Sequence, residues 1–210
     1  MTAMTVLADQ TEAIKAAASA IADELTASSL DVRNPEWDGS QFLKVTNVPG
    51  IVCEVLVGAD GSVEWEWRPL DSRKADPAWT AEAVLRILGA DATAHPPAAP
   101  AGQFSFKSVV GRMLADCGMR VCVNVQVDQR FFEVYSEILV TNPERPGRGS
   151  ACVGDDGSVF WQCRISEQPG DAGALDPGEI ARMVARALTE KGHVGSASCD
   201  PKASTRGAGL

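Results

Sequence analysis

Apolar residues recur at helical spacing in four stretches of the chain. The first stripe lies on one face of a predicted helix and consists of Ile14, Ala17, Ala18, Ile21 and Leu25. A second stripe of the same kind runs from Phe106 to Cys117. Two more helices are predicted directly after Asp76-Pro77 and Asp176-Pro177, because aspartate is a good N-cap and proline suits the first helical position.

Between the predicted helices, apolar and polar residues alternate as they do in half-buried strands. The pattern predicts strands at about 41–47, 51–57 and 62–68, and again at about 120–127, 131–141, 150–154 and 158–165. An Asp-Gly pair precedes the last strand of each set, and glycine accepts the positive φ that a tight hairpin turn requires. On these last strands we expect two sets of residues to share one face: Val63, Trp65 and Trp67, and Val159, Trp161 and Cys163.

The second half of the chain repeats the first. Residues 57–68 read VGADGSVEWEWR and residues 153–164 read VGDDGSVFWQCR, with eight identities in twelve positions. Shorter matches flank this segment in the same order, such as LKVTN at 43–47 against ILVTN at 138–142. The sequence therefore predicts that residues 57–68 and 153–164 form equivalent hairpins.

The repeat predicts an α+β protein made of two tandem α-β-β-β-α units, at residues 9–90 and 104–190. We expect each unit to be an antiparallel sheet with helices on one face, and the pair to be arranged as a pseudo-dimer. Residues 91–103 are rich in alanine and proline and are predicted to be a linker. Residues 191–210 are small and polar and are predicted to be a flexible tail.

This element order, with a tryptophan strand after an Asp-Gly turn and a helix that begins at Asp-Pro, resembles bacterial secretion-chaperone-like proteins. The similarity is to the type III secretion chaperone-like and YbjN-type families, and short motifs such as VGDDGSVFWQCR carry it. The resemblance covers most of both units and implies binding of a peptide or protein without catalysis. It assigns no role to any single residue.

The charge of the chain narrows the range of partners. The formal net charge is −9, and 14 acidic and 7 basic side chains lie between residues 9 and 90, against 12 and 9 between residues 104 and 190. Such a surface repels phosphate backbones and anionic lipid, so we expect no nucleic acid or membrane partner, whereas a basic polypeptide would be attracted. The opening MTAMTVLADQ has no basic start followed by an apolar core, so we expect no signal peptide and a cytoplasmic location.

The sequence offers few groups for catalysis or metal binding. It contains no GxSxG, P-loop, GxGxxG or HExxH motif. Its two histidines, His95 and His193, lie in the predicted linker and tail, and none of its six cysteines forms a CxxC pair. We therefore expect no metal, no cofactor, no catalytic residue and no disulfide.

The candidate binding residues come from the two equivalent hairpins and one tryptophan without a counterpart. Trp65 and Trp161 recur at the same repeat position, and we expect both to anchor the core. The positions that differ between the repeats are better candidates for contact with a partner. The predicted surface comprises Trp37, Glu64, Glu66, Trp67, Arg68, Phe160, Gln162 and Arg164.

Three functional hypotheses remain at this point. The first is a module, monomer or homodimer, that binds a protein or peptide in a groove or along a strand edge. The second is a protein that binds a small molecule in a tryptophan-lined pocket between the units. The third is an enzyme that uses carboxylates such as Glu64 and Glu66, which requires partial burial of one of them to raise its pKa.

Overall fold

The computed structural model describes residues 3–33, 36–37, 40–58, 60–90, 104–128, 133–165 and 175–189. The helices are α1 (Ala3–Ala27), α2 (Pro77–Ile87), α3 (Phe106–Asp116) and α4 (Pro177–Thr189), with short 3₁₀ turns at Ser72–Lys74 and Pro146–Arg148. The strands are β1 (Val32–Arg33), β2 (Glu36–Trp37), β3 (Ser40–Val45), β4 (Ile51–Val57), β5 (Ser62–Pro69), β6 (Arg120–Asp128), β7 (Glu133–Thr141), β8 (Ser150–Val153) and β9 (Val159–Arg164).

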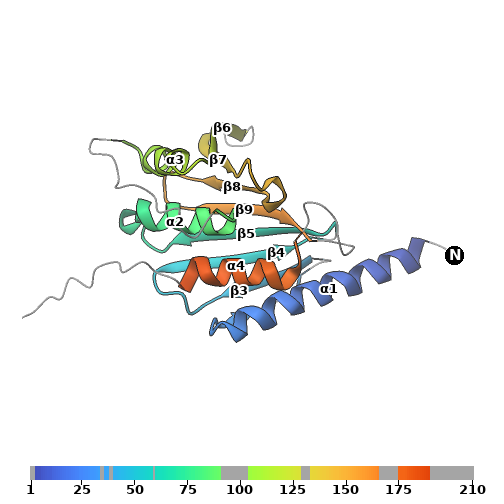
Figure 1. The fold of residues 1–210 in the computed structure, drawn as a ribbon. Coiled ribbons are helices and arrows are strands. Elements are labelled where there is room, and N and C mark those ends of the chain that lie inside the picture. Colours follow the sequence, from blue (N-terminus) through green and yellow to red (C-terminus); the bar gives the residue numbers. More distant parts are fainter. Residues whose placement is uncertain are drawn as a thin grey trace, which may run out of the picture.

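All nine strands form one antiparallel sheet. The strand order is β1-β3-β4-β5-β9-β8-β7-β6, and β2 also pairs with β3. β5 and β9 pair along most of their length, which places Trp65 directly opposite Trp161. The strands of the two predicted units therefore meet at β5 and β9 and continue as a single sheet (Figure 1).

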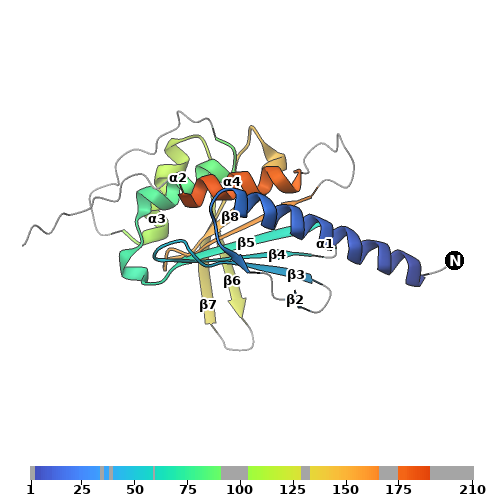
Figure 2. The same ribbon diagram turned by 90° about the horizontal axis from the view of Figure 1, so that it is seen from below.

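The four helices lie on one face of the sheet, which leaves the other face without helices (Figure 2). α1 contacts α4, and α2 contacts both α3 and α4. Alternate residues of the strands point into this helix layer, so the burial of β9 alternates strictly along the strand. The α+β class, a mixture of helices and antiparallel sheet, is confirmed.

The two repeated segments form hairpins with the same register. Val57 lies opposite Val63 in the first, and Val153 lies opposite Val159 in the second. In each turn an aspartate side chain accepts hydrogen bonds from the serine two residues later, Ser62 for Asp60 and Ser158 for Asp156. The prediction of equivalent hairpins is confirmed, and the side-chain bonds lower the pKa of Asp60.

The helices after Asp-Pro also begin as predicted. The side chain of Asp76 accepts a hydrogen bond from the Ala78 N–H at 2.9 Å, and that of Asp176 accepts one from the Glu179 N–H at 3.1 Å. These bonds satisfy N–H groups that have no partner within the helix. The predicted linker at 91–103 and the predicted tail at 191–210 lie outside the described residues.

Candidate functional site: the helix-free face of the sheet

Six of the predicted surface residues lie side by side at the junction of β5 and β9. They alternate with the buried residues of these strands and therefore occupy the helix-free face. Glu64 lies opposite Gln162, and Glu66 lies opposite Phe160. The Gln162 Nε2 donates a hydrogen bond to the Glu64 Oε1 at 3.1 Å. Arg68 and Arg164 occupy the same face at opposite ends of this group.

The prediction for Trp67 is wrong. Trp67 is 0% exposed, because it shares the helix-facing side of β5 with Val63 and Trp65 and packs in the core. A surface role was suggested because the second repeat has no tryptophan at the position equivalent to Trp67. That equivalent residue is Cys163, and it is buried as well. For Trp37 the structure describes the backbone in β2, and its side chain lies outside the described residues.

Trp65 and Trp161 anchor the core, as predicted. Both are 0% exposed and lie opposite each other beneath the helices. The Trp161 Nε1 donates a hydrogen bond to the Arg148 carbonyl at 2.8 Å. The Nε1 groups of Trp65 and Trp67 are buried without a hydrogen-bond partner among the described residues. Because these three side chains are in the core, they line no pocket for a ligand.

An apolar row crosses four strands of the helix-free face. The register places Cys122 opposite Leu139, Leu139 opposite Cys152, and Cys152 opposite Phe160. Leu139 and Cys152 are half-buried, and Phe160 is 36% exposed. Only Phe160 was predicted from the sequence. The alternation in 131–141 and 150–154 could have identified Leu139 and Cys152, because both lie at the alternate positions that point away from the helices.

The apolar row continues into charged residues. Glu66 lies opposite Phe160 on β5, Glu54 lies opposite Glu66 on β4, and Lys44 follows on β3. The Lys44 ammonium lies 3.4 Å from the Glu54 carboxylate. Glu66 is exposed and forms no ion pair with another described residue. On this face the apolar row therefore ends beside the carboxylates of Glu66 and Glu54, with Lys44, Arg68 and Arg164 close by and Glu137 next to Cys152.

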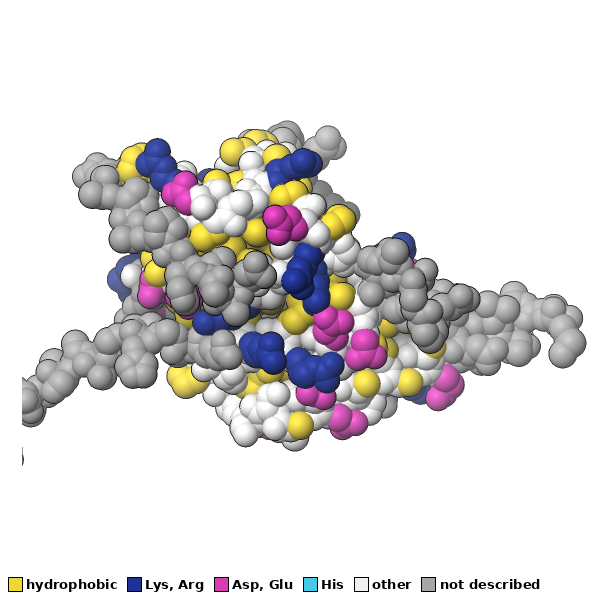
Figure 3. All heavy atoms as spheres, viewed as in Figure 1, with side chains coloured by type: hydrophobic (Ala, Val, Ile, Leu, Met, Phe, Trp, Pro, Cys, Tyr) yellow, Lys and Arg dark blue, Asp and Glu magenta, His cyan; other side chains and the backbone are white. Residues whose placement is uncertain are grey.

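The helix-bearing face has a different character. Lys and Arg side chains are interspersed with Asp and Glu side chains over the helices, and no large region of one sign is visible there (Figure 3). Two ion pairs between α4 and other elements illustrate the mixture, Arg182 with Glu24 at 3.6 Å and Arg148 with Glu179 at 2.6 Å.

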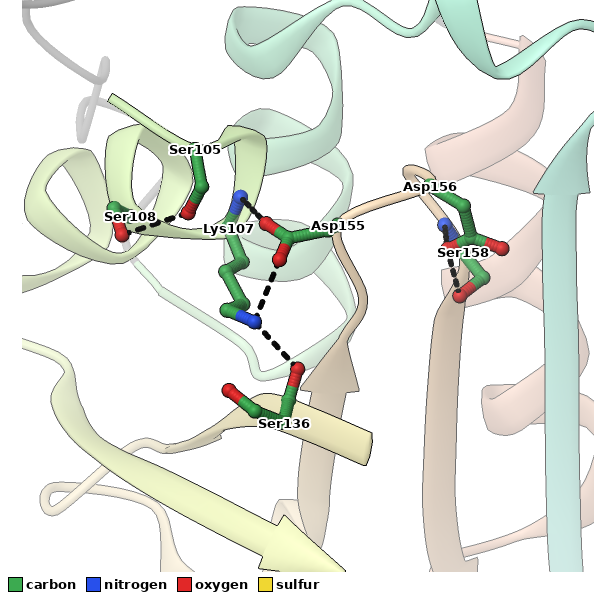
Figure 4. Close-up of polar contacts among 7 residues, drawn as sticks. All are labelled: Ser105, Lys107, Ser108, Ser136, Asp155, Asp156 and Ser158. Carbon is green, nitrogen blue, oxygen red and sulfur yellow. Dashed lines mark hydrogen bonds and ion pairs between the residues drawn. The ribbon is translucent and has the colours of Figure 1, made fainter. Parts of the chain in front are cut away.

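A polar cluster fixes α3 to the second hairpin. The Lys107 Nζ lies 2.6 Å from an Asp155 carboxylate oxygen and donates to the Ser136 carbonyl at 2.7 Å (Figure 4). The Lys107 backbone N–H also donates to Asp155. Burial alone would raise the pKa of Asp155, but the hydrogen bonds from Lys107 and Ser105 outweigh it and lower that pKa. The two contacts of the Lys107 ammonium thus connect α3 to the second hairpin and to β7.

Described residues line two hollows that border the sheet. One, of about 510 Å³, lies at the end of β9 and is lined mainly by polar and glycine residues, among them Asp60, Gln162 and Arg164. The other, of about 350 Å³, is more apolar and lies between Ile51, Leu70 and Trp79, with Gly157 from the second hairpin at its wall. The second hollow is the closest counterpart of the predicted tryptophan-lined pocket, although its tryptophan is Trp79.

We searched the part of the chain that the structure describes for metal sites, disulfides and reactive thiols. Within it, no three His, Cys, Asp or Glu side chains converge in a way that could hold a metal ion. The five cysteines within the described ranges form no disulfide with one another. Burial raises the pKa of the Cys163 thiol to about 12 and also raises the pKa of the Cys53 thiol. None of the described helices is long and apolar enough to cross a bilayer.

Comparison with known proteins adds no relative. No protein-family model, no curated protein and no solved structure matches this chain.

Proposed function

We propose that this protein binds another polypeptide on the helix-free face of its sheet and catalyses no reaction. The observation that carries the proposal is the apolar row from Cys122 to Phe160, which ends beside the carboxylates of Glu66 and Glu64. An uncovered antiparallel sheet face is normally polar, whereas apolar residues bordered by charge are typical of interaction surfaces.

The geometry favours a polypeptide partner with apolar and basic residues. Adjacent strands are about 4.8 Å apart, so a row over four strands extends about 15 Å, which matches two to three turns of an amphipathic helix. A lysine or arginine next to the apolar contacts of such a segment would meet Glu66. The net charge of −9 would increase the rate of encounter with a basic partner.

The proposal extends to the arrangement of the two repeats. In a pseudo-dimer, β5 and β9 are equivalent strands, and their pairing brings both divergent sets of outer residues to the centre of one face. Glu64 and Glu66 from one unit then lie beside Gln162 and Phe160 from the other. This arrangement is consistent with the resemblance to secretion-chaperone-like proteins, and it gives a single asymmetric surface from two similar units.

Catalysis by the carboxylates of this face lacks the environment it requires. A general acid at neutral pH needs burial or a close like charge that raises its pKa. Glu66 is exposed, its like-charged neighbour Glu54 is paired with Lys44, and Glu64 accepts a hydrogen bond from a neutral amide. Neither carboxylate lines the two hollows described above, although Gln162, the partner of Glu64, lines the larger one.

The test is a charge reversal on the proposed surface with a matched control. The probe is a labelled amphipathic peptide of alternating leucine and lysine clusters, and its binding is followed by fluorescence anisotropy. Glu64→Lys combined with Glu66→Lys should raise the Kd at least about tenfold, because two attractive contacts become repulsive. Glu12→Lys combined with Asp23→Lys changes the net charge equally on exposed positions of α1 and should leave the Kd within about twofold.

Two outcomes would contradict the proposal. The first is equal loss of affinity in both double variants, which would mean that only net charge matters. The second is unchanged binding by the Glu64→Lys, Glu66→Lys protein. Substitution of exposed Glu66, Glu12 and Asp23 should change stability by about 0.5 kcal/mol or less. Glu64 is half-buried, so thermal unfolding by circular dichroism should confirm that the Glu64→Lys, Glu66→Lys protein is folded before its Kd is compared. Phe160→Ser should weaken binding without a change of charge.

A small-molecule site is the second candidate, favoured by the hollow between Ile51, Leu70 and Trp79. Its volume of about 350 Å³ is within the range of small-ligand pockets, and its wall is largely apolar. An aromatic ligand there should quench part of the tryptophan fluorescence in the wild type and not in Trp79→Phe. Unchanged quenching in that variant would exclude this hollow as the site.

A further inference from the structure

The two edges of the sheet differ in length and protection. One edge consists of β1 and β2, each of two residues, and short strands are a common protection against edge-to-edge pairing. The other edge is β6, which has nine residues from Arg120 to Asp128 and pairs with β7 alone among the described strands. β6 contains no proline or lysine, the residues that most often protect an edge.

The outer part of β6 is apolar and uncovered. Val123 is 70% exposed and Val125 is 58% exposed, although Ile138, directly opposite Val123 on β7, is buried. α3 packs against these strands at Gly111, where an added Cβ would lie 3.4 Å from Val121 and 3.2 Å from Ile138, and its Lys107 reaches the Ser136 carbonyl opposite Val125. The β6–β7 hairpin extends from there past the helices (Figure 2). Neither valine contributes to the buried core of the single chain.

The sequence of β6 is complementary to itself in antiparallel alignment. The strand reads RVCVNVQVD, with Asn124 at its centre. An antiparallel copy centred on Asn124 places Arg120 opposite Asp128, Val121 opposite Val127, and Val123 opposite Val125. Opposite charges at both ends and valines between them are cross-strand pairs that stabilise a sheet.

We propose that β6 is a homodimerisation strand, which pairs with β6 of a second copy about a twofold axis through Asn124. The interface is isologous, so each Arg120–Asp128 pair and each valine pair occurs twice. A second copy is the occupant that satisfies both charged ends of the strand in one register. The sheets of the two copies then continue into one another, and the exposed valines become covered.

The dimer leaves the junction of β5 and β9 free, since that junction lies in the middle of each sheet. The proposal therefore goes beyond the polypeptide site on the helix-free face, and the two share only Cys122, at the outer end of the apolar row on β6. Loss of dimerisation would say nothing against peptide binding by Glu64 and Glu66.

The first test measures the oligomeric state of the full chain by sedimentation equilibrium over a range of concentrations. The wild type should be dimeric. The Val123→Lys dimer would hold two new lysines, one from each copy. Each should raise the dimer Kd on the order of tenfold, or about 100-fold together. Leu70→Lys is the matched control, because Leu70 is 71% exposed and lies away from β6, and it should dimerise like the wild type. A monomeric wild type, or a Val123→Lys protein as dimeric as Leu70→Lys, would overturn the proposal.

The second test is specific for the register. Arg120→Asp should weaken the dimer, because two aspartates would then face each other at each end. Asp128→Arg should weaken it in the same way with two arginines. The double variant Arg120→Asp, Asp128→Arg should restore the dimer, because opposite charges face each other again. In a Cys122→Ser background, Asn124→Cys should form an intermolecular disulfide under mild oxidation, because directly opposed Cα atoms are about 4.5–5.5 Å apart. Failure of the double variant to recover together with absence of the cross-link would refute this pairing.

Discussion

Trp65 and Trp161 offer a measurement of one buried hydrogen bond within a single protein. They occupy the same repeat position, lie opposite each other in the sheet and are both 0% exposed. They differ in the partner of the indole N–H: the Trp161 Nε1 donates to the Arg148 carbonyl at 2.8 Å, whereas the Trp65 Nε1 has no partner among the described residues. The perturbation is tryptophan to phenylalanine at each site, which removes the N–H and the same number of ring atoms.

The two substitutions should differ in cost. Both leave a similar void, so the loss of packing is about equal and cancels in the comparison. Trp161→Phe also leaves the Arg148 carbonyl without its donor, at a cost of about 1–3 kcal/mol, whereas Trp65→Phe removes a donor that was already unpaired. We therefore expect Trp161→Phe to lower the free energy of unfolding by about 2 kcal/mol more than Trp65→Phe.

The assay is equilibrium unfolding in urea, followed by far-ultraviolet circular dichroism so that the loss of a tryptophan does not alter the signal. Comparable m-values in the two variants would show that the same surface is exposed on unfolding. A difference below about 0.5 kcal/mol, or a larger loss in Trp65→Phe, would refute the reasoning. It would mean that the bond to Arg148 contributes no more than the packing around it.

Two further predictions concern ionisable groups. Asp155→Asn should lower stability at pH 7 by about 1 kcal/mol or less, the range of a partly exposed ion pair. Because the pKa of Asp155 is lowered in the folded state, its contribution is present above the usual aspartate pKa of about 3.9 and is lost as the pH falls through the folded value. The difference in free energy of unfolding between the wild type and Asp155→Asn, measured in urea, should therefore be smaller at pH 3 than at pH 7. An equal difference at both pH values would contradict this. Iodoacetamide at pH 8 should modify exposed Cys122 in the native protein and spare Cys53 and Cys163, whose thiol pKa values are raised by burial; mass spectrometry showing equal rates for all three would count against it.

Local patterns predicted most of the fold. The Asp-Gly turns, the alternation around Trp65 and Trp161 and the Asp-Pro helix starts each depend on a few neighbouring residues, and the structure contains all of them. The pairing of β5 with β9 has no such local signal, because it joins segments far apart in the chain. That pairing is what gathers six of the predicted surface residues at one place.

The candidate site was predicted less completely for the same reason. Glu66 and Phe160 are recognisable as outer residues from alternation alone, but their neighbours Leu139 and Cys152 depend on the strand order. Trp67 shows the opposite error. Its place in the alternation assigned it to the core, and comparison between the repeats led away from that correct signal.

The way the helices and strands interleave has a consequence for synthesis of the chain. α1 packs on α4, and β5 receives its second neighbour only when β9 is made. A chain emerging from the ribosome therefore holds an open β5 edge, and an α1 that is packed on β3 but not yet on α4, until α4 is available. Contacts between such distant segments slow folding and lengthen the time during which apolar surface is exposed. The nascent chain thus depends on late residues to complete a core that the first residues begin.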